Sequence, residues 1–210
     1  VLENTMKTTP KDISPHVKLP IPHHVALIMD GNRRWAEIRK KSYLEGYHQG
    51  AETLTKIVRF AASVGVKQLT AYSFSTENWT RSKEEVDILM NLFVYYLEVE
   101  EPTMIKEGVR LEVIGHLEKL PLPVQKAFER VRESTKNGKQ ITLVIAVNYG
   151  GRNELIRGML KMFADIEEGL LSKSDVNEET FAKYLDTAPF KDQELVNRSS
   201  GEFRISNFMP

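Results

Sequence analysis

Short apolar runs alternate along the chain with longer stretches in which apolar residues recur every three or four positions. The short runs are typical of strands buried on both faces, and the longer stretches have helical spacing. Strands are predicted at residues 25–29, 68–74, 109–114, 141–147 and 194–196. Helices are predicted at residues 51–64, 83–97, 123–135, 153–166 and 178–185. Ser82 with Glu85 predicts a capping box at the start of the second helix.

This alternation predicts an α/β fold. Strand, helix and strand repeated in this way imply right-handed crossovers and a mostly parallel central sheet flanked by helices. Residues 1–22 contain four prolines and scattered charges, so an irregular N-terminal arm is predicted there. Residues 23–210 show no internal repeat and are predicted to form one domain.

Composition narrows the possible functions. The chain has 210 residues with 29 Lys and Arg and 29 Asp and Glu, so its net charge gives no support for nucleic-acid binding. It contains no cysteine, which excludes disulfides, thiolate zinc sites and a cysteine nucleophile. Because no apolar run approaches the roughly 18 residues of a spanning helix, we expect a soluble, cytoplasmic protein.

The residues that follow the predicted strands share one chemistry. Residues 30–35, 73–81, 148–152 and 198–207 each contain Arg together with Asn or Ser. In open parallel sheets, ligands bind beyond the carboxyl ends of the strands. Guanidinium groups match phosphate oxygens, so these loops predict a diphosphate site around a single carboxylate, Asp30. Mg²⁺ takes one or two carboxylates and fills its remaining positions with water and phosphate, so Asp30 is its predicted ligand.

Each feature taken singly has a simpler interpretation. An Asp-Gly pair often only forms a turn, Arg33 and Arg34 could be a solvated pair, and Glu202 with Arg204 could be a surface ion pair. These interpretations would have to hold separately at four strand ends. The coincidence favours a binding site.

The segments HVALIMDGNRRWA, SFSTENWTR, VNYGGRNEL and RSSGEFRISNF resemble, in order, the motifs of the cis-prenyltransferases. The similarity extends from about His24 to Phe208. It implies a homodimeric enzyme that uses Mg²⁺ to condense isopentenyl diphosphate onto an allylic primer, usually farnesyl diphosphate. The product would be a long Z-polyprenyl diphosphate such as undecaprenyl diphosphate, the bacterial carrier of cell-wall sugars. Because that product partitions into membranes, the resemblance implies at most a peripheral association of the protein with the membrane surface.

The resemblance also implies roles for individual residues. Asp30 would bind Mg²⁺ and the allylic diphosphate, and Asn78 would assist the departing diphosphate, so these two are the predicted catalytic residues. Arg198, Arg204 and Ser206 match the group that receives isopentenyl diphosphate. The complete predicted substrate-binding set is Gly31, Asn32, Arg33, Arg34, Trp35, Arg39, Tyr43, Tyr47, Ser75, Glu77, Trp79, Arg81, Arg198, Arg204 and Ser206.

An apolar tunnel for the growing prenyl chain is also implied. Its predicted lining is Trp35, Phe74, Trp79, Leu89, Leu92, Phe93 and Tyr96, with Ile141 deeper and Ala71 as a further candidate. For these side chains, ordinary core packing is the alternative. The two alternatives predict different effects of enlarging a side chain.

The chain departs from the family pattern in three places. Arg33 replaces the usual Gly, and Tyr43 and Tyr47 replace an Arg and a His that belong to the diphosphate site. The nearby basic residues that could compensate are Arg39, Lys40, Lys41 and His48. Family members also continue beyond the position of Pro210 to a further metal-binding acid, so we expect this sequence to lack a C-terminal segment. We therefore expect the chain as given to bind an allylic diphosphate better than it condenses it.

Two other classes of function are considered. One is a non-catalytic subunit of the same fold that binds prenyl lipid or supports a partner, but such subunits typically lose the Asp-Gly-Asn and Asn-x-x-Arg motifs kept here. The other is a nucleotide-binding domain, which would need a glycine-rich or Walker loop after a strand, and the sequence has none. The enzyme is the favoured interpretation.

Overall fold

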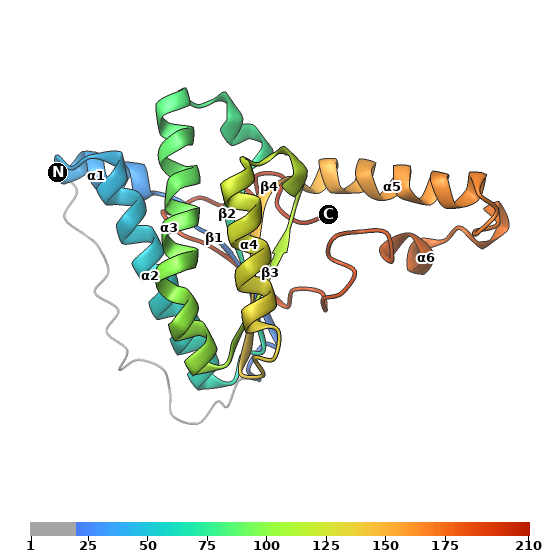
Figure 1. The fold of residues 1–210 in the computed structure, drawn as a ribbon, viewed down its shortest axis with the longest axis horizontal. Helices are drawn as coiled ribbons and strands as arrows, with labels where there is room; N and C mark the ends of the chain where they lie inside the picture. Colours follow the sequence, from blue (N-terminus) through green and yellow to red (C-terminus); the bar gives the residue numbers. More distant parts are fainter. Residues whose placement is uncertain (1–19) are drawn as a thin grey trace.

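The computed structural model describes residues 20–210, which form a single α/β domain around a parallel five-stranded sheet (Figure 1). The strands are β1 (His24–Ile28), β2 (Gln68–Ser75), β3 (Val109–Ile114), β4 (Ile141–Tyr149) and β5 (Leu195–Arg198). Their order across the sheet is β3-β4-β2-β1-β5, and every pair is parallel. The predicted fold class is confirmed. Of the predicted N-terminal arm, residues 1–19 lie outside the described residues.

The helices follow the predicted pattern with shifted boundaries. They are α1 (Asn32–Ile38), α2 (Tyr43–Val64), α3 (Lys83–Glu107), α4 (Leu122–Thr135), α5 (Gly151–Glu167) and α6 (Glu178–Ala182), with 3₁₀ turns η2 (Thr76–Thr80), η3 (Leu117–Lys119) and η4 (Lys173–Asp175). Helix α2 begins well before the predicted residue 51, because Ser42 and Glu45 cap its start. The Ser42 hydroxyl accepts a hydrogen bond from the Glu45 N–H at 3.3 Å, and the Glu45 carboxylate accepts one from the Ser42 N–H at 3.0 Å.

Two local predictions were wrong. Helix α1 was predicted as part of a loop, although residues 32–38 are helical. At the start of α3, the Ser82 hydroxyl accepts a hydrogen bond from the Glu85 N–H at 3.3 Å, as predicted. The Glu85 carboxylate does not complete the capping box, since it contacts Tyr47 and Arg81 instead.

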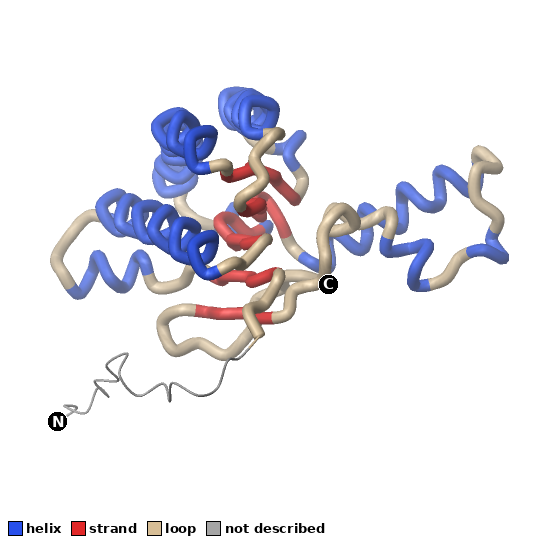
Figure 2. The backbone as a smooth tube through the Cα atoms, turned by 90° about the horizontal axis from the view of Figure 1, so that it is seen from below, coloured by secondary structure: helices blue, strands red, loops and turns tan. Residues whose placement is uncertain are grey.

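The two faces of the sheet are covered differently. Helices α2, α3 and α4 lie on one face and enclose the larger core, as Figures 1 and 2 show. A smaller apolar cluster on the other face includes Tyr72, Tyr149 and Phe208, and Phe208 comes from the stretch after β5. Helix α5 leads away from the body of the domain and returns through α6 (Figure 2). Within residues 20–210, no helix is both long and apolar enough to cross a bilayer.

Candidate active site

A polar cavity of about 990 Å³ lies beyond the carboxyl ends of the central strands. It is lined by residues from the loops after β1, β2, β4 and β5, including Asp30, Asn78, Arg152 and Arg198. The register explains this convergence, because Ile28 of β1 is paired with Tyr72 of β2 and with Arg198 of β5. The predicted meeting of these loops at one edge of the sheet therefore holds.

Asp30 lines this cavity and is paired with Arg198. Arg198 donates to the Asp30 carboxylate from Nη2 at 2.7 Å and from Nε at 3.2 Å, and the Gly31 N–H donates to its other oxygen at 2.7 Å. Partial burial acts to raise the pKa of Asp30. The hydrogen bonds from Arg198 and Gly31 outweigh burial and, with the nearby charge of Arg34, hold that pKa below its ordinary value.

Gly31 is required by both conformation and space. Its φ is +91°, and a Cβ at this position would lie 1.8 Å from the Ser200 hydroxyl oxygen. The same serine donates a hydrogen bond to the Asp30 carbonyl at 2.9 Å, and Ser199 donates another at 2.7 Å. The loop after β5 thus fixes the backbone of the loop after β1. Both serines belong to the segment RSSGEFRISNF of the sequence, but only the fold shows their contact with Asp30.

The predicted isopentenyl diphosphate group is assembled by Arg198. Its Nη1 donates to the Ser206 hydroxyl at 2.6 Å and to the Arg204 carbonyl at 2.5 Å. The Arg204 side chain itself pairs with Glu202 at 2.6 Å and is 66% exposed. Arg34 Nη2 lies 3.7 Å from Glu202 and 3.9 Å from Asp30. These guanidinium groups surround the cavity, but carboxylates already contact them.

The loop after β2 folds back on itself. The Asn78 side-chain oxygen accepts from the Ser75 N–H at 3.0 Å. Asn207 donates to Glu77 at 2.9 Å, while its own side-chain oxygen accepts from the Arg152 N–H at 2.9 Å. Burial acts to raise the pKa of Glu77, but the hydrogen bond from Asn207 and others outweigh it and lower that pKa. Asn207 thereby joins three of the predicted loops, a role not predicted for it.

Four predicted site residues lie outside the polar cavity and also outside a second, apolar cavity between α2, α3 and the sheet. The Arg39 guanidinium is 4.6 Å from the ring centroid of Trp35. Trp79 donates from Nε1 to the Asn148 side chain at 2.7 Å, and Tyr43 contacts Arg33. The structure therefore does not bring Trp35, Arg39, Tyr43 and Trp79 to the cavity walls, and their predicted contact with substrate is untested.

The basic residues that could compensate for the missing Arg and His do not line the polar cavity. Except for Lys40, each of them contacts another side chain instead. Lys41 pairs with Glu45 at 2.9 Å and His48 bonds Tyr96 at 2.8 Å. Arg33 contacts one of the two replacing residues: its Nη2 donates to the Tyr43 hydroxyl at 3.1 Å, and its guanidinium lies 4.6 Å from that ring's centroid. Arg33 lines the polar cavity and also pairs with Glu37 at 3.0 Å.

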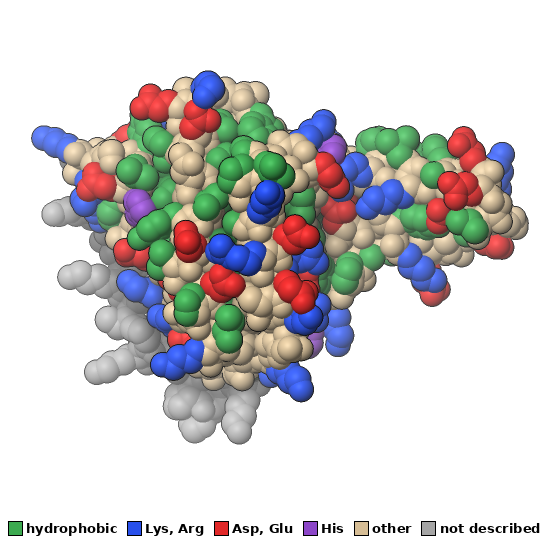
Figure 3. Space-filling view, viewed as in Figure 1, with side chains coloured by type: hydrophobic (Ala, Val, Ile, Leu, Met, Phe, Trp, Pro, Cys, Tyr) green, Lys and Arg blue, Asp and Glu red, His purple; other side chains and the backbone are tan. Residues whose placement is uncertain are grey.

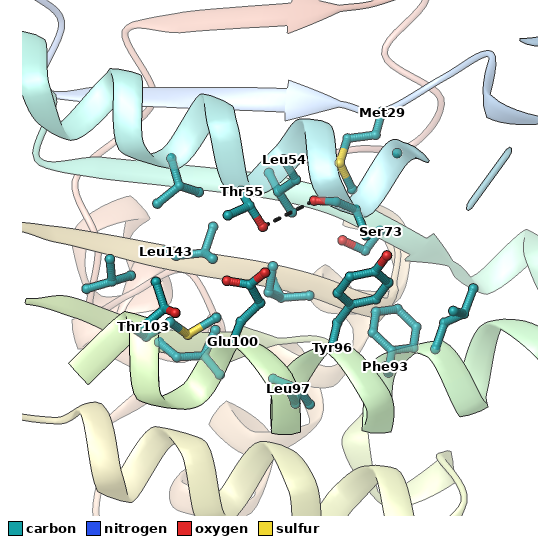
Figure 4. A pocket seen from close by; sticks show the side chains of 18 of the residues that line it. Met29, Leu54, Thr55, Ser73, Phe93, Tyr96, Leu97, Glu100, Thr103 and Leu143 are labelled. Carbon is teal, nitrogen blue, oxygen red and sulfur yellow. Dashed lines mark hydrogen bonds between the residues drawn. The ribbon is translucent and has the colours of Figure 1, made fainter. Parts of the chain in front are cut away.

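An apolar cavity of about 170 Å³ lies between α2, α3 and the sheet (Figure 4). The predicted lining residues Leu89, Leu92, Phe93 and Tyr96 do line it. Ile141 and Ala71 do not, because both are buried in the surrounding core. Phe74 lies on the wall of the polar cavity instead. Sequence reasoning could not separate these cases, since cavity wall and core have the same apolar pattern.

The two cavities meet at a junction formed by residues that line both. These residues are Met29, Asn32, Tyr47, Ser73 and Leu89. A ligand at this junction would face guanidinium groups on one side and apolar side chains on the other. The site therefore defines a class of protein that binds a charged head group and an apolar tail together.

Asp30 is also the candidate metal ligand. Within residues 20–210, no three acidic or histidine side chains cluster as a metal site. One partly exposed carboxylate beside a cavity lined by guanidinium groups is a donor set that suits Mg²⁺ held mainly by phosphate and water. The site fits such an ion.

Comparison with known proteins identifies the family. Residues 28–210 match the family model Prenyltransf, described as "Putative undecaprenyl diphosphate synthase". The chain is 46% identical to an isoprenyl transferase of Bacillus anthracis over 90% of this chain and 73% of that protein, and 45% identical to one of Thermotoga maritima over 90% and 80%. This chain belongs to the cis-prenyltransferase (isoprenyl transferase) family and is a prenyl transferase.

Solved structures agree with this assignment. Lavandulyl diphosphate synthase of Lavandula x intermedia, solved in complex with dimethylallyl diphosphate, matches with a TM-score of 0.88 and 33% identity, covering 90% of this chain and 82% of that one. A probable undecaprenyl diphosphate synthase of Campylobacter jejuni matches with a TM-score of 0.73 and 30% identity, covering 91% and 81%. The fold is therefore that of a family with experimentally determined members.

Proposed function

We propose that this enzyme condenses isopentenyl diphosphate onto an allylic diphosphate, farnesyl diphosphate, to make a long Z-polyprenyl diphosphate. Undecaprenyl diphosphate, the carrier of cell-wall sugars, is the proposed product. The observation that carries the proposal is the junction, where a cation-rich cavity and an apolar one share five lining residues. Substrates with a diphosphate head and a prenyl tail match both halves.

The proposed chemistry follows from the charges around the polar cavity. Ionising the allylic C–O bond develops negative charge on the diphosphate, which donors already in place stabilise more in the transition state than in the ground state. Arg34, Asn78 and Arg81 are the proposed groups on that diphosphate, and Arg198, Arg204 and Ser206 hold the second substrate. Mg²⁺, held by Asp30, supplies further charge neutralisation when bound. The double bond of isopentenyl diphosphate attacks the allylic carbon, and one proton then leaves.

The direct test is incubation of the chain with radiolabelled isopentenyl diphosphate, Mg²⁺ and farnesyl diphosphate, followed by sizing of the products. Parallel reactions with dimethylallyl diphosphate identify the preferred primer. We expect elongated products from farnesyl diphosphate. Absence of any elongated product, also from a chain extended at its C-terminus, would favour the alternative of a partner or prenyl-binding subunit.

A homodimer is the proposed assembly. Helix α5 projects from the domain, and Figure 3 shows apolar side chains in green on this arm. The large exposed apolar side chains of α5 are Leu155, Ile156, Leu160 and Phe163. Exposed apolar patches of this kind mark association surfaces. Light scattering after gel filtration tests this assembly, and Phe163→Lys should shift the chain toward monomer. A peripheral association with the membrane surface is also proposed, and its sole basis is that the proposed product partitions into membranes.

A further inference from the structure

Glu85 has surroundings that its place in the sequence does not explain. It lies in the first turn of α3, and only 7% of its side chain is exposed. Its carboxylate accepts hydrogen bonds from the Tyr47 hydroxyl and from Arg81 Nη1, the latter at 2.8 Å. Arg33 Nη1 lies 3.9 Å from its second oxygen. A buried carboxylate is costly unless it is paired, and these three groups provide the pairing.

The groups that Glu85 holds face the substrate cavities. Tyr47 lies at the junction, and Arg33 and Arg81 line the polar cavity, whereas Glu85 lines neither cavity. Arg81 Nη1 also donates to the Tyr47 hydroxyl at 2.8 Å, which closes a triangle of contacts. Burial and the hydrogen bond to Glu85 raise the pKa of Tyr47 to about 12, so its hydroxyl keeps its proton at neutral pH.

Helix capping does not account for this arrangement. A favourable charge in the first turn of α3 is already supplied by the exposed Glu84. The Ser82 hydroxyl accepts a hydrogen bond from the Glu85 N–H, but the Glu85 side chain points inward rather than back to the helix start. The inward position is therefore explained by the groups it meets.

We propose that Glu85 is a positioning residue that fixes the Arg81 guanidinium in the polar cavity and the Tyr47 hydroxyl at the junction for binding of the substrate diphosphate. The proposal rests on the proposed function, because it assigns the anion to that substrate. The proposal predicts an effect of removing Glu85 that is opposite to the effect expected from charge repulsion alone. A carboxylate beside an anion site repels the anion, so removing it would tighten binding if charge alone mattered. If Glu85 positions Arg81, removing it weakens binding.

The experiment compares Glu85→Ala and Glu85→Gln with the matched controls Glu84→Ala and Glu84→Gln in the full chain. Affinity for inorganic diphosphate with Mg²⁺ is measured by calorimetry, and kcat and KM for farnesyl diphosphate are measured separately. Glu85→Ala should lose about tenfold or more in diphosphate affinity, the factor expected for losing a charge-assisted hydrogen bond. Glu85→Gln should retain most of it, because it keeps an acceptor of the same shape. The Glu84 variants should bind as wild type or slightly tighter.

A double-mutant cycle shows whether Glu85 acts through Arg81. Arg81→Ala should weaken diphosphate binding, and adding Glu85→Ala should then cause little further loss. Additive losses, or a folded Glu85→Ala variant that binds as tightly as wild type, would overturn the proposal. If melting curves show that Glu85→Ala does not fold, Tyr47→Phe replaces it, with a loss of several-fold expected. A wild-type chain that binds diphosphate without elongating primer would count against the proposed function alone.

Discussion

The polar cavity and the apolar cavity share five residues but are stabilised in different ways. The polar cavity is walled by loops whose backbones are held by hydrogen bonds, such as those from Ser199 and Ser200 to the Asp30 carbonyl. The apolar cavity is walled by the faces of α2 and α3 against the sheet and is held open by packing. In the first region one atom can decide function. In the second, side-chain volume decides.

The largest effect that this comparison predicts is at Asp30. Asp30→Ala removes the one carboxylate of residues 30–35. Its position lies just after the end of β1 and outside the core. Turnover should fall by about 10²- to 10³-fold, because electrostatic assistance to the departing diphosphate is lost. The melting temperature should change little. Asp87→Ala, which removes an exposed carboxylate on α3, is the control. Near-normal turnover that still requires Mg²⁺ would refute the assignment.

Glycine substitutions test whether backbone placement in the polar cavity matters beyond stability. Gly31→Ala and Gly65→Ala both put an alanine at positive φ, at +91° and +100°, but only Gly31 meets a neighbour. Gly65→Ala should lose about 1–2 kcal/mol of stability. Gly31→Ala should lose more than that, because its Cβ also meets the Ser200 hydroxyl. Gly31→Ala should also lose about 10²-fold in turnover, since it displaces the loop that carries Asp30. Equal turnover of the two variants would show that the Ser200 contact has no functional role.

Enlarging an alanine separates the apolar cavity from the core around it. Ala51 on α2 lines the cavity, whereas Ala71 on β2 is fully buried in the core. Ala51→Leu should shorten the products, because the prenyl tail meets the new side chain earlier. Ala71→Leu should cost about 1–3 kcal/mol of stability by overpacking and leave product length unchanged. Melting curves and product chromatography on both variants measure this, and the reverse pattern would exchange the two assignments.

The smallest expected effect concerns acid stability. The pKa of Asp30 is lowered in the folded protein, so its ionised form stabilises the fold. That contribution is complete well above the ordinary value of 3.8 and is lost as the pH falls through the lower folded value. Because the side chain is 29% exposed, the difference between wild type and Asp30→Asn should be below about 1 kcal/mol at neutral pH. Denaturant titrations should show this difference shrinking below about pH 4, and a constant difference would contradict the prediction.

Much of the fold could be predicted because its signals are local. The run at β1 and the apolar residues of β4 are buried as their composition implies. Helix α1 was missed because it follows the strand after only a few polar residues and has a single buried side chain, Ala36. The early start of α2 depended on the pairing of Ser42 with Glu45, a capping signal present in the sequence.

The candidate site was predictable to the level of which loops meet. Strand order places the loops carrying Asp30 and Arg198 together, and the motif resemblance names both. Sequence could not show that Glu85 turns away from the helix start, because the same Ser-x-x-Glu spacing serves a cap at α2. The available signal was that Arg81 stands four residues before Glu85, just ahead of the start of α3. The contact of Arg33 with Tyr43 likewise depends on side-chain direction.

The geometry of the whole site depends on the register in which β5 pairs with β1. Arg198 reaches Asp30 only because Ile28 lies opposite Arg198, on an edge strand whose other residues are exposed. A slip of one residue would move that guanidinium by about 3.3 Å and turn it to the opposite side of the sheet. Insertions in the loop before β5 would leave this alignment intact, whereas one inserted residue inside β5 would disconnect the two substrate sites. The pairing of these two short strands therefore sets the distance between Asp30 and Arg198, on which the proposed spacing of the two substrates depends.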